Sequence, residues 1–184
     1  FSDRRLEMYE NAAASKTTLL VNGVGLPHPG TVAVAPVSGP GWDGVALDGT
    51  AAARFGSPVH RCTRRVLLLE HRALLIIDRV ALEHAAQAEA RFHTDARVRA
   101  TRAGARLIGT RAALHLAFAA DVPAVLRRTR GLPTCPRRDA ETVLRWMTAG
   151  RQCAMTLVTL LTPRGPGRVR IDTRRRQIIA AGPD

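Results

Sequence analysis

Residues 65–80 read RVLLLEHRALLIIDRV. Two largely apolar segments, 65–69 and 74–80, flank the polar triplet Glu70-His-Arg72, and this pattern predicts a β-hairpin. Within each segment the apolar residues follow one another instead of alternating with polar ones, which indicates strands buried on both faces. Asp78 interrupts the second segment and must be paired if it is buried. We expect Arg79 or Arg65 to be its partner and its role to be structural.

Short apolar segments separated by turn signals continue on both sides of this hairpin at intervals of about ten residues. Turn pairs such as Asn22-Gly23 and Asp48-Gly49 close two of them. The expected strands are 18–21, 31–37, 45–47, 97–100, 105–108, 114–118, 153–161, 168–172 and 177–180. About a dozen strands without a long helix predict an all-β fold, a large antiparallel β-sandwich (supersandwich), as a single domain over residues 1–184.

Two segments do not fit this pattern directly. Residues 80–92 are rich in Ala, Glu and Gln and have good helix propensity. They are compatible with a short helix, but we favour a loop that leads into a strand at 90–94. Residues 127–139 contain Pro133, Pro136 and five arginines, and we expect them to form a mobile basic loop.

Arginine dominates the charge of the chain. The formal net charge is +13, and Lys16 is the only lysine among the 28 Lys and Arg residues. Planar guanidinium groups bind carboxylate, sulfate and phosphate in a bidentate manner, so a polyanionic partner is one explanation. A GC-rich genome, which enriches Arg, Ala, Gly and Pro together, is the other. Charge alone names no partner.

Several classes of function lack support in the sequence. No Gly-rich phosphate loop, H-E-x-x-H zinc motif or G-x-S-x-G nucleophile elbow is present. Aromatic residues make up only 4% of the chain and offer few stacking platforms, so we expect no nucleic-acid partner. No run of about 18 apolar residues occurs, so we expect no membrane insertion. Cys62, Cys135 and Cys153 form no C-x-x-C pair, and we expect free, buried thiols.

Four segments, in order, resemble the C-terminal β-sandwich domain of the heparinase II/III-like polysaccharide lyase family. Residues 5–23 resemble its opening strand, in which a His-Asn-Thr triplet precedes an apolar strand that ends in Asp-Gly or Asn-Gly. Residues 59–80 resemble its H-R-R hairpin, 91–94 its following strand and 156–163 a late strand. Each segment is a weak signal alone, but together they cover nearly the whole chain in the family's order.

This resemblance implies a reaction. Members of the family cleave uronate-containing polysaccharides by β-elimination: a group neutralises the C6 carboxylate, a base removes the C5 proton, and an acid protonates the departing O4. The base and acid, a Tyr and a His or Asn, come mainly from an upstream (α/α) toroid. No part of this sequence resembles the toroid. We therefore assign no catalytic residue in this chain, and Tyr9 is not given either role.

The resemblance also implies a context for the chain. It would be a fragment of a longer lyase, with the upstream toroid of the same chain and an acidic polysaccharide as partners, and it would form one wall of the substrate cleft. The polar start Phe1-Ser2-Asp3 shows no initiator Met or signal peptide, and we expect the fragment alone to be inactive. We expect the complete protein in the periplasm or cell envelope of a bacterium. The alternative is a non-catalytic basic β-sandwich that binds polyanionic glycan.

Candidate site residues follow from the same resemblance. Sandwich domains of the family often bind a structural zinc, the one cofactor implied here, through two histidines and an aspartate. Lys16 and Thr17 occupy the places of the usual His and Asn, and Lys is a poor zinc ligand at neutral pH unless it is strongly desolvated. His60, and more weakly Asp48, are the remaining metal candidates. Lys16 and His93 are expected near the substrate cleft; the alternative for Lys16 is a solvated side chain before a strand.

Overall fold

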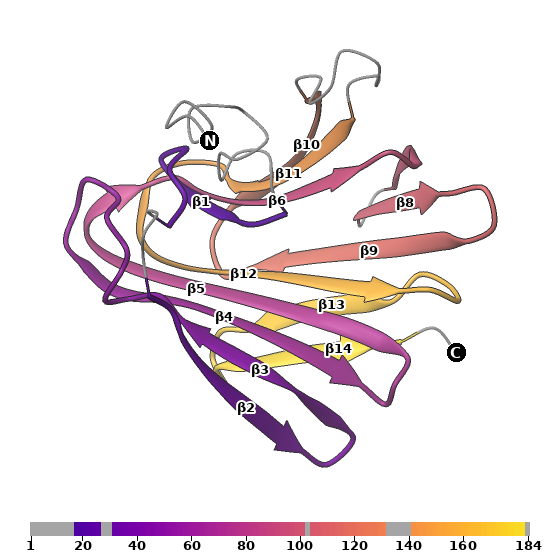
Figure 1. Cartoon of the computed structure of the whole chain (residues 1–184), viewed down its shortest axis with the longest axis horizontal. Coiled ribbons are helices and arrows are strands. Elements are labelled where there is room, and N and C mark those ends of the chain that lie inside the picture. The colour runs from indigo at the N-terminus through magenta and orange to yellow at the C-terminus, as the bar shows by residue number, and fades with distance from the viewer. Residues whose placement is uncertain (1–16, 27–30, 102–103, 132–140, 183–184) are drawn as a thin grey trace, which may run out of the picture.

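A computed structural model describes residues 17–26, 31–101, 104–131 and 141–182. These residues form fourteen β-strands and no helix (Figure 1), which confirms the predicted all-β class. Within these ranges no helix has the length and apolar character that a membrane span requires.

Eight strands form one large antiparallel sheet in the order β2-β3-β4-β5-β12-β9-β8-β7. The hairpin predicted from residues 65–80 is β4–β5 at its centre, and β12, from much later in the chain, pairs with the other edge of β5. The sheet therefore joins both halves of the sequence. The strand bounds are β2 Ala33–Gly39, β3 Trp42–Asp48, β4 Val59–Leu69, β5 Ala73–Ala86, β7 Arg97–Thr101, β8 Gly104–Ile108, β9 Ala113–Ala120 and β12 Gln152–Thr162.

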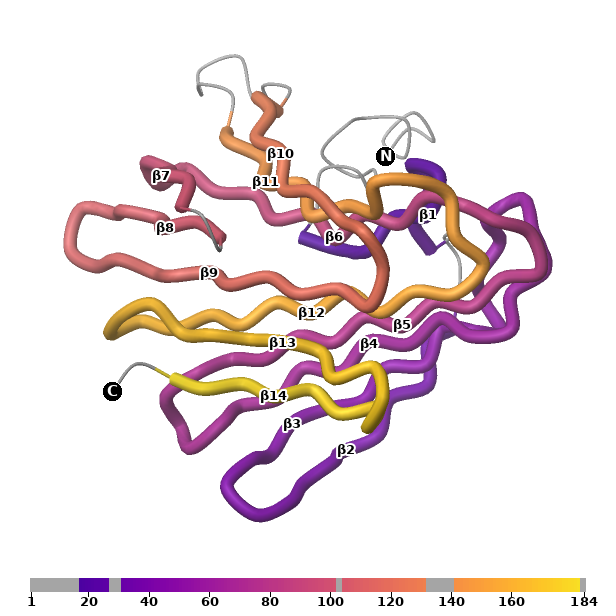
Figure 2. The backbone as a smooth tube through the Cα atoms, turned by 180° about the vertical axis from the view of Figure 1, so that it is seen from behind, coloured from indigo at the N-terminus to yellow at the C-terminus, as the bar shows by residue number. Residues whose placement is uncertain are grey.

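A smaller sheet and a hairpin cover the two faces of the large sheet. The small sheet has the order β1-β6-β11-β10, and β13 and β14 pair only with each other. Seen from behind, the β13–β14 hairpin lies across the large sheet on the side away from the small one (Figure 2). The result is the predicted sandwich with a third, two-stranded layer. The bounds are β1 Leu19–Val21, β6 Ala88–Thr94, β10 Ala124–Arg130, β11 Thr142–Thr148, β13 Arg168–Asp172 and β14 Gln177–Ala181.

The two sheets are joined at Gln87, the single residue between β5 and β6. Its backbone N–H donates to Asn22 Oδ1 at 3.1 Å, and its side-chain Nε2 donates to the Thr148 carbonyl at 2.9 Å. The flanking Ala86 and Ala88 are buried, because only small side chains fit this crowded corner. The alanines of residues 80–92 thus serve a bend between sheets. The strand expected at 90–94 is confirmed, and the loop expected before it is wrong. Tertiary packing also overrides the helix propensity of residues 80–92.

The basic segment 127–139 is also not a loop throughout. Its first four residues belong to β10, which pairs along its length with β11. The loop prediction is therefore wrong for 127–130, which lie on an edge strand and are all exposed. Residues 132–140 lie outside the described residues.

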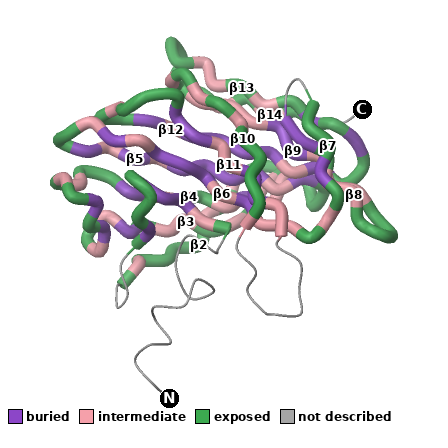
Figure 3. Tube along the Cα trace, turned by 90° about the horizontal axis from the view of Figure 1, so that it is seen from above, coloured by how far each residue is buried: buried purple, intermediate pink, exposed green. Residues whose placement is uncertain are grey.

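Two apolar clusters on opposite faces of the large sheet form the core. Ile76 of β5 and Leu157 of β12 belong to the cluster between the sheets, whereas Ile77 and Leu160 of the same strands lie under the β13–β14 hairpin. The two-sided burial predicted for both hairpin strands is confirmed for β5 and wrong for β4, where Leu67 is buried but Val66, Leu68 and Leu69 are half-buried. Buried residues run along β5 and β12 and continue into β6 and β11, whereas β10 is largely exposed (Figure 3).

Asp78 lies inside this core and pairs with Arg64. Arg64 Nε contacts Asp78 Oδ1 at 2.6 Å and Nη2 contacts Oδ2 at 3.0 Å, and only 2% of the Asp78 side chain is exposed. Burial alone would lower the pKa of Arg64, but the charge and hydrogen bonds of Asp78 raise it above its usual range. The expected partners, Arg79 and Arg65, were wrong. Arg64 stands directly opposite Asp78 in the β4–β5 register, so both point to the same face, and Arg65 and Arg79 point to the other.

The two described cysteines are free, as expected, but they differ in environment. Cys62 is buried beside this ion pair, and burial, followed by the charges of Asp78 and Asp48, raises the pKa of its thiol to about 11. Cys153 is exposed, so the expectation of burial is wrong for it. Cys135 lies outside the described residues.

Replacement of Asp78 by Ala tests how much the buried Arg64–Asp78 pair contributes to the free energy of unfolding. The variant leaves the Arg64 guanidinium without its carboxylate in the core, which we expect to lower the free energy of unfolding by about 3–5 kcal/mol. Urea denaturation of the 184-residue chain measures this loss. Asp43→Ala, on the exposed part of β3, is the matched control and should stay within about 0.5 kcal/mol of the parent. Equal losses in both variants would contradict a special role for Asp78.

Candidate functional site

Residues 88–93 of β6 read AEARFH and alternate apolar with polar side chains. The apolar members lie in the core between the two sheets. Because side chains of a strand alternate between its faces, Glu89, Arg91 and His93 lie on the outer face of the small sheet. β6 thus separates a packing surface from a chemically functional one.

Strand β11 adds two more charged groups to this outer face. Arg145 stands opposite Arg91 in the register of the two strands, and Val143 stands opposite His93. Glu141 immediately precedes β11 and contacts His93. We call the set Glu89, Arg91, His93, Glu141 and Arg145 the polar face.

Glu89 holds the two arginines of the polar face together. Its Oε1 accepts from Arg91 Nε at 2.6 Å and from Arg145 Nε at 2.8 Å, and its Oε2 accepts from Arg145 Nη2 at 2.6 Å. Glu89 is buried. Burial alone would raise the pKa of the carboxyl, but the hydrogen bonds from Arg145 and Arg91, together with their charges, lower it below its ordinary value of 4.5. The hydrogen bonds to Glu89 in turn raise the pKa of Arg145, so this pair stays ionised at neutral pH.

His93, like Glu89, is an enclosed titratable group of the polar face. Its side chain is 7% exposed, and Nδ1 lies 2.6 Å from Glu141 Oε1. Nε2 is buried and has no hydrogen-bond partner among the described residues. When neutral His93 donates Nδ1–H to the carboxylate, Nε2 keeps a free lone pair. A buried polar atom without a hydrogen-bond partner is uncommon in folded proteins, so the position of Nε2 needs an explanation.

An aromatic layer lies beneath the polar face and fixes the two strands that carry it. Phe92 of β6 meets Phe118 of β9 at a centroid distance of 6.0 Å, and Phe118 stacks on Trp146 of β11 at 5.3 Å. These contacts bridge the two sheets directly below His93 and Arg145. The positions of the charged groups above them are thereby set by packing.

Of the two predicted cleft residues, the structure describes His93, and its place in a substrate cleft stays a prediction. His93 lies on the polar face, and its backbone N–H donates to Thr17 Oγ1 at 3.2 Å. Thr17, just before β1, therefore lies beside His93. Lys16 lies outside the described residues, and its place near the cleft stays a prediction.

The predicted metal candidates lie elsewhere, in the large sheet. His60 is exposed at the start of β4, and Asp48 is exposed at the end of β3. Asp48 Oδ1 accepts from the Thr50 backbone N–H at 2.9 Å, and this contact with Thr50 lowers the pKa of the carboxyl. Asp48 therefore serves the turn that follows β3.

The described residues contain no group of three or more His, Cys, Asp or Glu side chains that could hold a metal ion. In the register of β3 with β4, Asp48 stands opposite Thr63, three residues along the strand from His60. That offset separates the two by about 10 Å of strand, too far for one ion to bind both in this conformation. His60 and Asp48 thus do not fit a shared zinc ion, and a structural zinc in this domain stays a prediction without an identified ligand set among the described residues.

Sequence reasoning missed most of the polar face. Glu89 and Arg91 were readable from the period-two alternation of residues 88–93, which is the usual signature of a half-buried strand. Arg145 and Glu141 carry no such signal, because β11 mixes buried and half-buried residues on both faces.

Replacement of Glu89 by Gln tests the network through its pH dependence. Because the folded-state pKa of Glu89 is lowered, its contribution is present above its ordinary value of 4.5 and is lost as the pH falls through the lowered one. At neutral pH we expect the variant to lose roughly 1.5–3 kcal/mol of unfolding free energy.

Urea denaturation of parent and variant at several pH values measures this difference, which should shrink towards zero once the carboxyl of the folded parent is protonated. Glu83→Gln, an exposed position of β5, is the control and should show no such trend. A loss that is constant with pH would contradict the ionic role of Glu89.

No protein-family model matches the sequence, and no curated protein matches it. Solved structures do match the fold. Heparinase III aligns with a TM-score of 0.71 and 10% identity over 94% of this chain and 28% of its own. The heparan sulfate lyase HepC from Pedobacter heparinus aligns with a TM-score of 0.68 and 11% identity over 88% of this chain and 26% of its own. A further heparinase III structure aligns with a TM-score of 0.70 and 8% identity over 94% and 30%.

At sequence identities of 8–11%, the similarity to these structures shows a shared fold. The chain spans between 26% and 30% of the length of these three structures. The resemblance to the sandwich of heparinase II/III-like lyases is thereby confirmed at the level of three-dimensional structure, and this chain has the β-sandwich fold found within heparinase III.

Proposed function

We propose that residues 1–184 form the C-terminal β-sandwich domain of a polysaccharide lyase that cleaves uronate-containing polysaccharide by β-elimination. The observation that carries the proposal is the match of 94% of this chain to part of heparinase III at a TM-score of 0.71. The proposal includes a helical toroid upstream in the same protein, which supplies the base and the acid. It also places the complete protein in the periplasm or cell envelope of a bacterium.

In this proposal the polar face is the wall that the sandwich contributes to the substrate cleft. The cleavage of an acidic sugar requires cationic groups that meet its carboxylate. Arg145 is suited to this task because its side chain is 29% exposed and Glu89 fixes its guanidinium. A guanidinium held in place in this way loses less conformational freedom when it binds a carboxylate.

His93 has a positioning role in this wall. Its Nε2 is enclosed, so the imidazole does not meet the reacting sugar directly. Its Nδ1 instead holds Glu141 at the entry to β11, and its backbone N–H holds Thr17 at the entry to β1. One residue thus fixes the starts of two strands beside which the acidic sugar would lie.

A non-catalytic module that binds polyanionic glycan is the second candidate. The observation that favours it is the net charge of +13, which includes many exposed arginines. The two candidates differ in turnover and not in affinity for acidic glycans, so turnover separates them.

The first test measures ultraviolet absorbance while the full-length protein acts on heparan sulfate, hyaluronan, chondroitin or alginate, beside the 184-residue chain alone. β-Elimination creates an unsaturated uronate, whose conjugated double bond absorbs in the ultraviolet. We expect absorbance to rise with the full-length protein on one of these substrates and not with the isolated chain. Salt-sensitive binding without a rise on any of them would reject the lyase and support the binding module.

The second test substitutes His93 in the full-length protein. His93→Ala removes the contact with Glu141, and we expect kcat to fall about tenfold or more, because misplaced cleft groups lose transition-state contacts. His93→Asn places an amide near the position of Nδ1 and should restore much of kcat. His84→Ala, at an exposed position of β5, is the matched control and should leave kcat unchanged. Equal kcat in the Ala and Asn variants would contradict a positioning role through Glu141.

A further inference from the structure

The outer face of the large sheet carries a hollow beside the turn of the β13–β14 hairpin. A cavity of about 490 Å³ opens there, and an adjoining one of about 300 Å³ continues along β4 and β5. Arg61 and Arg79 line both cavities. The hairpin covers only the apolar part of this face, around Leu75 and Leu160, and leaves the polar part open.

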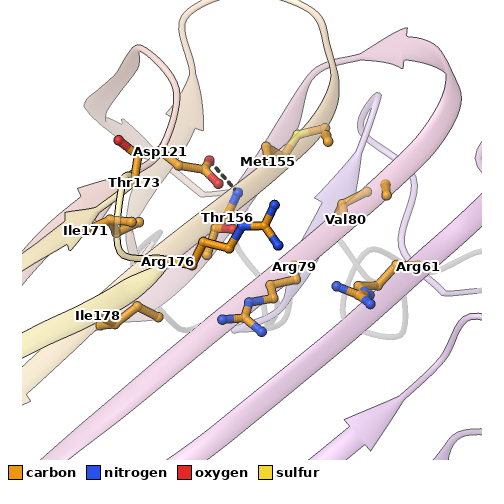
Figure 4. Close-up of a pocket in the computed structure, with 12 residues that line it drawn as sticks. Arg61, Arg79, Val80, Asp121, Met155, Thr156, Ile171, Thr173, Arg176 and Ile178 are labelled. Atoms are coloured by element: carbon orange, nitrogen blue, oxygen red, sulfur yellow. Dashed lines mark hydrogen bonds between the residues drawn. The ribbon is translucent and has the colours of Figure 1, made fainter.

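Four arginines from three elements meet at this hollow. Arg61 and Arg65 lie on β4, Arg79 on β5, and Arg176 on the turn between β13 and β14. Figure 4 shows Arg61, Arg79 and Arg176 around the larger cavity, with Asp121 at its far side. We call the two cavities and these four residues the arginine groove.

The strand register explains why these arginines gather. Arg79 stands between Thr63 of β4 and Thr156 of β12, its direct neighbours in the sheet. Arg61 and Arg65 are two positions from Thr63 in either direction, so all three arginines point to the same face. Threonine hydroxyls between guanidinium groups add uncharged hydrogen-bonding groups to the groove.

The charges of the arginine groove are only partly balanced within the described part of the chain: four arginines face two carboxylates, Asp48 and Asp121, and the charge of Arg61 contributes to the lowered pKa of Asp48. None of the four arginines forms a salt bridge with a described residue. Two carboxylates line the cavities, and both already accept backbone hydrogen bonds, Asp48 from Thr50 and Asp121 from Thr156 at 2.7 Å. Like charges on neighbouring strands repel each other, so an anion bound between them would relieve a repulsion that the fold itself leaves in place.

Arg176 occupies a backbone position that suits a different residue. Its φ of 53° lies in the left-handed region, which glycine or asparagine adopts with less strain. Backbone geometry alone would favour glycine or asparagine at this position. Arg176 shares this conformation with Asn22, Glu70 and His71, and it is the one of the four whose side chain lines the larger cavity.

We propose that the arginine groove binds the sulfate and carboxylate groups of an acidic polysaccharide, at a site separate from the polar face. Guanidinium groups bind such oxyanions with paired hydrogen bonds. Arg61 and Arg65 are about 13 Å apart along the strand, so a single small anion does not reach all four arginines and a chain with repeated anionic groups does. No aromatic side chain lines either cavity, which disfavours stacking of nucleic-acid bases.

The site would hold polymer without cleaving it. The groove and the polar face lie on opposite sides of the large sheet, with the core between the sheets separating them. Occupation of two sites by one long chain raises the local concentration of substrate at the second. This inference does not require lyase activity and applies equally to a binding module.

The test measures binding of a defined heparin oligosaccharide to the 184-residue chain by isothermal titration calorimetry. The groove variant combines Arg61→Gln, Arg79→Gln and Arg176→Gly; glycine at 176 relieves the left-handed backbone, and circular dichroism confirms folding. The control variant combines Arg106→Gln, Arg111→Gln and Arg164→Gln at exposed positions outside the groove, which removes the same charge.

We expect the groove variant to bind about tenfold more weakly or worse, and the control to change by less than about threefold. Equal weakening in both variants would show general attraction to a basic surface and would overturn the proposal. Inorganic sulfate is the second probe. Weak competition by sulfate supports the assignment, whereas binding of sulfate as tight as that of the oligosaccharide would show a single-ion site and overturn the polysaccharide ligand. Because turnover is not measured, these outcomes are independent of the lyase proposal.

Discussion

From Ala73 to Asp78, strand β5 is covered on both faces, and this constraint organises the large sheet. One face packs under the small sheet and the other under the β13–β14 hairpin. A strand in this position tolerates a charge only where a partner stands directly opposite, and Arg64 meets that requirement for Asp78. Two interactions therefore fix the register of β4 with β5: apolar packing and the Arg64–Asp78 ion pair with its two hydrogen bonds. A slip by one residue would turn both sets of side chains to the wrong face.

The same register decides how the arginines of the chain are used. Arg64 points inward and is neutralised by Asp78, whereas Arg65 and Arg79, one residue away on each strand, point outward into the arginine groove. On the small sheet, Glu89 binds two arginines at once. Arginine thus occurs in three environments in this chain, which differ in the distance from the guanidinium to a carboxylate. The functional proposals follow from these differences and not from the total charge.

The sequence alone predicted the fold class and most strands, because turn pairs and apolar segments are local signals. The β4–β5 hairpin and the strands from 97 to 118 were readable for this reason. The corner at Gln87 was not, since its alanines favour a helix in isolation and only contacts with Asn22 and Thr148 impose the bend. The partner of Asp78 was missed because neighbours in sequence were considered in place of the residue opposite in the sheet. Of the site, His93 was reached by resemblance, whereas Glu89 and Arg145 depend on pairing between distant strands.

The strand order has a further consequence for the behaviour of the chain in solution. β2 and β7 are the two borders of the large sheet, and each leaves a row of backbone groups unpaired among the described residues. Such borders invite edge-to-edge pairing between molecules and, at worst, aggregation. β2 carries Pro36, which lacks an amide hydrogen, and β7 carries the exposed Arg97 and Arg99. Part of the arginine surplus therefore stands at a border of the large sheet, where charge disfavours the addition of strands from other molecules.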